Sequence, residues 1–121
     1  MTGTSAPALE PAGPGRFALR GEVSFATAGP LLDAGVRAFA GQPAVTVDLA
    51  AVTRVDSAGL ALLLEWLRQG RAAGRSTRFT GLPDKLLAIA RLAGVDALLA
   101  GGHSTSSAVS VSASSSSASS R

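Results

Sequence analysis

The chain has 121 residues, a net charge of +3 from eleven basic and eight acidic side chains, and no cysteine. This length suits one hydrophobic core, and the missing thiols exclude a disulfide framework, a cysteine metal site and a thiol nucleophile. The basic excess is carried almost wholly by arginine and is not interleaved with aromatic side chains, which argues against nucleic-acid binding.

The two ends of the chain differ in composition from its middle. Residues 1–15 contain three of the six prolines and almost no large apolar side chain, so we expect a disordered amino-terminal arm without a secretory signal. Residues 104–121 are nearly all Ser with some Ala and Val, which predicts a disordered tail over residues 101–121. The folded domain is therefore expected over residues 16–100.

The first part of this domain predicts two strands and a helix. Residues 17–20 and 22–25 have the pattern of two short strands joined at Gly21. Residues 32–39 then place apolar side chains at the spacing of one helix face, and Gly41 predicts the end of that helix. The expected inner stripe of this helix consists of Leu32, Gly35, Val36 and Phe39.

The next strand carries the clearest alternation in the chain. Val45, Val47 and Leu49 share one face of residues 44–49, which predicts a strand in a sheet that is covered on one side. We expect this strand to end at Leu49 and a turn of several residues to follow.

The remaining elements are a helix, a strand and a further helix. The second helix is predicted to start near Ser57, a strand returns over residues 78–82, and Pro83 precedes the third helix. The inner stripes are Leu60, Leu63, Leu64 and Leu67 in the second helix, where Leu62 and Trp66 widen the apolar surface, and Leu86, Ile89, Ala90 and Ala93 in the third. The order β-β-α-β-α-β-α predicts a small α/β domain, with a mixed sheet of four to five strands and helices mainly on one face.

Few side chains in this sequence are suited to bond-breaking chemistry. His103 is the only histidine and lies beside the Ser-rich segment, so a Ser-His-Asp unit is not expected. The chain has no Gly-rich phosphate loop, no nucleophile elbow and no His/Cys/carboxylate cluster for a metal. Asp48 and Asp56 follow strand-like residues, but such aspartates are more often a helix cap and a surface charge than an acid/base pair. We expect a protein that is not an enzyme and has no catalytic residue, cofactor or metal.

The most informative segment of the chain is Asp56-Ser57-Ala58-Gly59-Leu60, which leads into a strongly apolar helix. A small polar side chain at a helix start can cap free backbone N–H groups, and a phosphate there would meet the positive end of the helix dipole. From the residues alone, this segment is either a local cap with a glycine for close packing or an exposed docking site.

In its context this segment resembles the turn of the STAS domains. That family includes the bacterial anti-sigma factor antagonists and the MlaB-type cytoplasmic subunits of phospholipid transporters. The resemblance covers residues 17–99, and residues 54–64 and 81–85 are similar to MlaB-type members. Family members share the predicted element order and carry an Asp-Ser/Thr-x-Gly-Leu turn at the head of the second helix.

The resemblance implies a non-catalytic subunit that binds and supports the ATPase of a phospholipid ABC transporter maintaining outer-membrane lipid asymmetry. Such a subunit is cytoplasmic and lies at the inner face of the inner membrane only through its partner. The alternative is an anti-sigma factor antagonist, in which an anti-sigma factor kinase phosphorylates Ser57 and the added charge breaks the complex. Ser57 is compatible with both functions.

The resemblance also implies a partner-binding surface centred on Ser57. Val55 and Leu60 are expected to anchor the turn from both sides, while Asp56 and Ser57 point to solvent. The predicted members of this surface are Arg54, Asp56, Ser57, Ala58, Gly59 and Leu60, with Phe25, Leu32 and Leu82 as flanking contacts.

Overall fold

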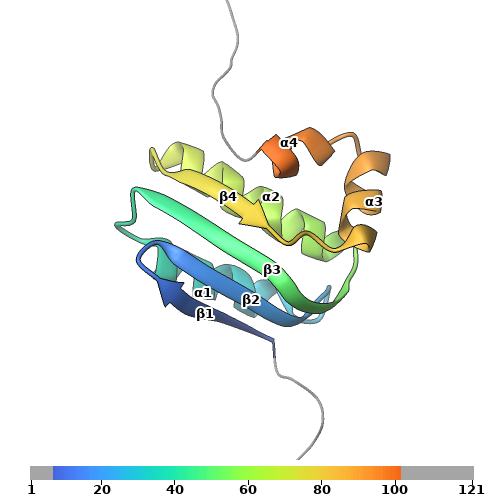
Figure 1. Cartoon of the computed structure of the whole chain (residues 1–121), viewed down its shortest axis with the longest axis horizontal. Helices are drawn as coiled ribbons and strands as arrows, with labels where there is room; N and C mark the ends of the chain where they lie inside the picture. Colours follow the sequence, from blue (N-terminus) through green and yellow to red (C-terminus); the bar gives the residue numbers. More distant parts are fainter. Residues whose placement is uncertain (1–6, 102–121) are drawn as a thin grey trace, which may run out of the picture.

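The computed structural model describes residues 7–101, which form a four-stranded sheet with helices packed mainly on one face (Figure 1). In chain order the elements are β1 (Ala8–Gly13), β2 (Arg16–Val23), α1 (Ala28–Phe39), β3 (Ala44–Val55), α2 (Ser57–Ala72), β4 (Ser76–Thr80), α3 (Asp84–Leu92) and α4 (Asp96–Gly101). The order as far as α3 confirms the predicted fold class, and α4 is an additional short helix. Of the expected tail over residues 101–121, Gly101 is the last residue of α4, and residues 102–121 lie outside the described residues.

The strands lie side by side in the order β1-β2-β3-β4. β1 runs antiparallel to β2, whereas β2, β3 and β4 are parallel to one another. The connections between the parallel strands are α1 and α2, which pack against each other behind the sheet in Figure 1, while α3 and α4 lie at the β4 side. Because the three parallel strands point the same way, the loops that follow them meet at one edge of the sheet.

Residues 8–13 were expected in a disordered arm, and this expectation is wrong. They form β1, which pairs with β2 from Ala8 opposite Arg20 to Gly13 opposite Arg16. Leu9 packs against the core, and Glu10 Oε2 lies 3.4 Å from Arg20 Nη2. The Pro-rich composition is compatible with a strand here because an edge strand leaves one row of backbone groups unpaired. Pairing with β2 supplies the order that the local sequence does not.

Two predicted breaks within strands are also absent. Residues 16–23 form the single strand β2 instead of two strands joined at Gly21, because Gly21 adopts a φ of +86° at a shift in the β2–β3 register. β3 likewise continues past Leu49 through the predicted turn and ends at Val55. Register shifts of this kind place extra residues in one strand, so β3 bends without ending. β4, at Ser76–Thr80, lies earlier than the predicted residues 78–82.

The core fills the space between the sheet and the helices α1 and α2. Phe39 packs edge-on against both Phe17 and Trp66, with ring centroids 5.1 and 5.2 Å apart. A Cβ atom on Gly35 would overlap the Trp66 indole, so this glycine lets α1 approach α2. The largest fully buried side chains are Trp66, Phe39, Leu19, Leu49, Leu63, Leu86, Leu99, Val23, Val45 and Val47. The predicted inward face of residues 44–49 is therefore confirmed.

The predicted inner stripes of the helices need correction. Because Trp66 occupies the space beside Gly35, α2 turns this indole inward, and Leu64 and Leu67 become only half-buried. The buried residues are Leu31, Gly35 and Phe39 in α1, Gly59, Leu60, Leu62, Leu63, Trp66 and Gly70 in α2, and Leu86 and Ala90 in α3. Of the remaining predicted stripe residues, Leu32 and Ile89 are half-buried and Val36 and Ala93 are exposed.

Neighbouring leucines of α2 provide a test of the observed helix phase. Leu63 is 1% exposed, so Leu63→Ala is expected to lower the free energy of unfolding by about 2–5 kcal/mol through lost burial and a residual cavity. Leu64 is half-buried and serves as the matched control with a smaller loss. Urea titration of both variants measures the difference, and equal losses would contradict the observed phase.

Candidate functional site

The predicted docking segment lies where the parallel strands end. The β2–α1 loop, the residue between β3 and α2, and the β4–α3 loop follow parallel strands and are therefore at the same edge of the sheet, on the right in Figure 1. Such an edge is a common place for binding sites in sheets with parallel strands. Asp56 occupies the middle connection, directly before the first residue of α2, Ser57.

The Asp56 carboxylate joins two parts of this edge. Its Oδ1 accepts hydrogen bonds from the backbone N–H groups of Ala58, at 2.9 Å, and Gly59, at 3.2 Å, and so caps α2. Its Oδ2 accepts a third hydrogen bond, from the N–H of Phe25 in the β2–α1 loop, at 3.1 Å. The Phe25 hydrogen bond is the main cause of a lowered pKa of Asp56, supported by Gly59, Ala58 and the charge of Lys85 and partly opposed by desolvation.

These contacts show that Asp56 and Ser57 have different roles at the start of α2. Asp56 is half-buried and its carboxylate is engaged by backbone groups, so the expectation that it points freely to solvent is wrong. Ser57 is exposed at the first helical position. The capping side chain is therefore Asp56, and the Ser57 hydroxyl lies beside it at the positive end of the helix dipole.

Gly59 and two apolar neighbours hold the start of α2 against the sheet. A Cβ atom on Gly59 would lie 2.6 Å from both the Val23 carbonyl oxygen and Val55 Cγ2, so no larger residue fits this approach. Val55 is 7% exposed and Leu60 is 5% exposed. Both are thus buried on either side of the turn, as predicted.

The β2–α1 loop brings an aromatic side chain to the same edge. Phe25 is 86% exposed, and its backbone is tied to Asp56. Ser24 and Thr27 of this loop were not among the predicted site residues. The Ser24 hydroxyl donates to the Glu22 carboxylate and accepts from the Ala26 N–H, and the Thr27 hydroxyl donates to the Glu22 carbonyl and accepts from the Ser24 N–H. Serine and threonine between a strand and a helix are typical of such turns, and this pattern in the sequence could have predicted their role.

The other predicted members of the surface differ in exposure. Arg54 is exposed near the end of β3, opposite Glu22 in the β2–β3 register, and Ala58 is half-buried in the first turn of α2. Leu82 is half-buried in the β4–α3 loop at the same edge.

Leu32 lies elsewhere. Its carbonyl accepts a hydrogen bond from Trp66 Nε1 at 3.5 Å, and Trp66 lies roughly 13 Å further along α2 than Ser57. The half-buried Leu32 side chain packs against the core. The structure therefore places Leu32 at the contact between α1 and α2 and not beside the Ser57 turn.

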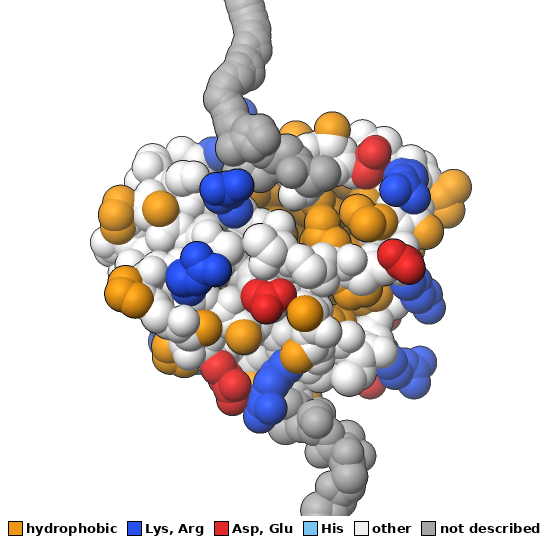
Figure 2. Space-filling view, in the orientation of Figure 1, with side chains coloured by type: hydrophobic (Ala, Val, Ile, Leu, Met, Phe, Trp, Pro, Cys, Tyr) orange, Lys and Arg blue, Asp and Glu red, His pale blue; other side chains and the backbone are white. Residues whose placement is uncertain are grey.

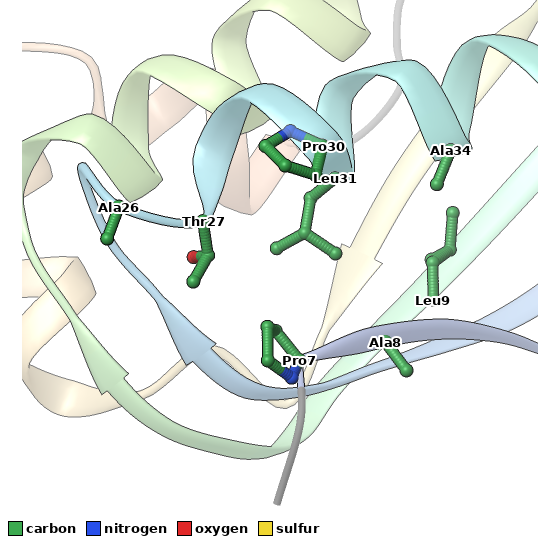
Figure 3. A pocket seen from close by; sticks show the side chains of 8 residues that line it. All are labelled: Pro7, Ala8, Leu9, Ala26, Thr27, Pro30, Leu31 and Ala34. Carbon is green, nitrogen blue, oxygen red and sulfur yellow. The ribbon is translucent and has the colours of Figure 1, made fainter.

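Other surface features do not form a comparable site. A hollow of about 210 Å³ lies between β1 and α1 and is lined by Pro7, Ala8, Leu9, Ala26, Thr27, Pro30, Leu31 and Ala34 (Figure 3). The face of the sheet opposite α1 and α2 carries dispersed charges of both signs (Figure 2). Within residues 7–101, no group of three His, Cys, Asp or Glu side chains could hold a metal ion. No helix in that range has the length and apolar character needed to cross a membrane.

The chain matches one protein-family model and is similar in fold to several solved structures. The model described as "Mlab, STAS domain" matches residues 10–100. An anti-sigma factor antagonist from Mycobacterium paratuberculosis is 26% identical with a TM-score of 0.57, and the match covers 78% of this chain and 81% of that chain. A sulfate transporter family protein from Wolinella succinogenes is 17% identical with a TM-score of 0.60, covering 81% and 80%. The phosphorylated form of SpoIIAA, a Bacillus cell fate determinant, is 16% identical with a TM-score of 0.59, covering 88% and 92%.

A comparison with curated proteins found no match. The two solved structures below 25% identity share the fold with this chain. The family therefore follows from the model match, and the fold likeness agrees with it.

Substitutions at both residues test whether Asp56 is the cap and Ser57 is only an exposed hydroxyl. Ser57→Ala is expected to change the free energy of unfolding by less than about 0.5 kcal/mol, because the serine is exposed and is not the cap. Asp56→Ala is expected to be clearly more destabilising, because the N–H groups of Phe25 and Ala58 lose their acceptor and the Gly59 N–H keeps only the Asp56 carbonyl. Urea titration compares the two, and a larger effect at Ser57 would contradict this assignment.

The lowered pKa of Asp56 predicts a dependence of stability on acid. A carboxyl whose pKa is lower in the folded than in the unfolded state stabilises the fold above its unfolded pKa, and this contribution is lost as the pH falls through the folded value. The stability difference between the wild type and Asp56→Asn should therefore shrink as the pH is lowered from 7 to 3. Urea titrations across that range measure it, and a constant difference would be evidence against the lowered pKa.

Proposed function

The chain belongs to the STAS domain family, and from this premise we propose that it is a non-catalytic subunit that binds the ATPase of a phospholipid ABC transporter. In this function the chain supports the ATPase and thereby the maintenance of outer-membrane lipid asymmetry. Its place is cytoplasmic, at the inner face of the inner membrane, and it reaches the membrane through the ATPase.

The observation that carries the proposal is the exposed Ser57 turn on a rigid base. Val55 and Leu60 are buried beneath it, Gly59 fits tightly against the ends of β2 and β3, and Asp56 caps the helix. The turn therefore presents a fixed surface, and a fixed surface loses little conformational freedom when a partner binds. This arrangement suits recognition of another protein.

The interface that we propose extends from the turn to its neighbours at the same edge. Its exposed and half-buried members are Arg54, Asp56, Ser57, Ala58, Phe25 and Leu82, while Gly59 and Leu60 support them from below. Leu32 is left out of this interface because it lies at the contact between α1 and α2.

The choice of a transporter ATPase rests on the type of STAS domain. The matching family model carries the description "Mlab, STAS domain", and the residues 54–64 resemble the MlaB-type turn. Both point to the transporter branch of the family.

The alternative function is that of an anti-sigma factor antagonist controlled by phosphorylation of Ser57. It is favoured by the exposed position of this hydroxyl at the start of α2 and by the likeness to the anti-sigma factor antagonist from Mycobacterium paratuberculosis. In that case the partner is an anti-sigma factor kinase, and the phosphate on Ser57 releases it.

A charge at Ser57 tests whether the turn lies in the interface. Ser57→Asp is expected to keep the stability of the wild type within about 0.5 kcal/mol, because a carboxylate at the first helical position favours the helix dipole. Binding to the ATPase subunit should weaken at least about 30-fold, because the added charge is desolvated without a partner. Calorimetric titration with the purified ATPase measures the affinity.

Ser76→Asp is the matched control for this experiment. Ser76 is exposed at the start of β4, the opposite edge of the sheet, and the same charge there should leave binding unchanged. Wild-type affinity of Ser57→Asp would remove the turn from the interface. Phosphorylation of Ser57 by an anti-sigma factor kinase, without binding to the ATPase, would favour the alternative.

A further inference from the structure

Phe25 has an exposed side chain on a hydrogen-bonded backbone. Its side chain is 86% exposed, the highest value among the large apolar side chains of the described residues except Leu92. Its backbone, in contrast, belongs to a loop in which every N–H group from Ser24 to Ala28 donates a hydrogen bond. A fully bonded loop thus holds an aromatic ring in water.

The hydrogen bonds of this loop come from within it and from Asp56. The Ser24 N–H donates to Thr27 Oγ1 at 2.9 Å, and the Ser24 carbonyl accepts from the N–H groups of Thr27, at 3.0 Å, and Ala28, at 2.8 Å. Thr27 Oγ1 donates in turn to the Glu22 carbonyl at 2.8 Å. These contacts close the loop into a compact turn, so the position of Phe25 is set before any partner binds.

The Asp56 carboxylate connects this turn to the helix that carries Ser57. One oxygen accepts from the Phe25 N–H, and the other accepts from the N–H groups of Ala58 and Gly59. The backbone of Phe25 and the first turn of α2, which begins at Ser57, are therefore joined by a single side chain. A partner that covers Ser57 meets Phe25 as well.

An exposed ring on a rigid turn is suited to act as an interface anchor. Aromatic residues are enriched in protein interfaces, and a few buried anchors carry most of the binding free energy. Ordering a loop on binding lowers the affinity, and a loop that is already ordered avoids this loss. The adjacent hollow between β1 and α1 is a weaker candidate, because nothing in the structure indicates what would fill it.

We propose that Phe25 is the anchor of the interface, inserting its ring into an apolar pocket of the ATPase, and that Asp56 is the positioning residue that holds it beside Ser57. This inference rests on the proposed function, since it names the contact through which the ATPase is bound. In this interface Phe25 supplies the apolar contact, and Ser57 is its polar neighbour, where an added negative charge weakens binding.

Truncation of Phe25 is the first test. Phe25→Ala is expected to raise the Kd for the purified ATPase subunit at least about 30-fold, the effect of losing a buried aromatic anchor. Its thermal stability should stay near that of the wild type, because the ring is exposed in the free protein. Leu92→Ala is the matched control: Leu92 is 91% exposed near the end of α3, and its truncation should leave the Kd unchanged.

Asp56→Asn tests the positioning role. Asn caps helices as well as Asp, so its Oδ1 can keep the bonds to Ala58 and Gly59. Its Nδ2 would then face the Phe25 N–H, and two donors cannot bond. We expect hydrogen exchange at the Phe25 amide to accelerate about tenfold or more, while the Ala58 and Gly59 amides stay protected. The Kd should rise roughly 3- to 10-fold, because the loop is now ordered only on binding.

The outcomes separate this inference from the proposed function. If the wild type binds the ATPase and Phe25→Ala binds equally well, the anchor is wrong and the transporter function stands. Unchanged exchange at the Phe25 amide in Asp56→Asn overturns the positioning role alone. A wild-type chain that does not bind the ATPase overturns both the function and the anchor.

Discussion

One carboxylate, that of Asp56, accepts hydrogen bonds from both a helix and a loop and thereby determines the arrangement of the candidate site. Asp56 follows β3 directly, and its two oxygens bind the first turn of α2 and the Phe25 N–H of the β2–α1 loop. Hydrogen bonds to an ionised acceptor are stronger than those between neutral groups. The ends of two parallel strands and the starts of two helices are thereby connected at one residue. Ser57 and Phe25 owe their fixed positions to this connection.

Close packing of the helices depends on two glycines, Gly59 beneath the site and Gly35 between α1 and α2. Gly59 allows the start of α2 to approach the Val23 carbonyl and Val55, and Gly35 gives space to the Trp66 indole between α1 and α2. Protein interiors tolerate little added volume, so a methyl group at either position would displace a helix. The two helices are held at one end by the Asp56 cap and further along by the packing of Trp66. A surface supported in this way suits binding that needs no large rearrangement.

The family and the geometry support different parts of the proposed function. Membership in the STAS family identifies the class of the domain, and the solved structures agree with its fold. The geometry adds which side chains meet at the edge of the sheet and which of them face solvent. An exposed hydroxyl beside an exposed ring offers a partner one polar and one apolar contact within a single rigid unit. Both proposed functions would use this same surface, and they differ in whether Ser57 carries a phosphate.

The sequence by itself determined the α/β class, the order of the elements from α1 to α3, the inward face of Val45, Val47 and Leu49, and the start of α2 at Ser57. These features depend on local periodicity and on the preferences of residues at helix starts, which a single chain segment displays. Only the tertiary structure decided that residues 8–13 form a strand, because pairing with β2 outweighs a composition rich in proline. It also decided that Trp66, and not Leu64 or Leu67, is fully buried, and that the Asp56 carboxylate holds the β2–α1 loop, since Gly35 and the Phe25 N–H come from segments distant in the sequence. Contacts between distant segments select one among several conformations that the local sequence permits.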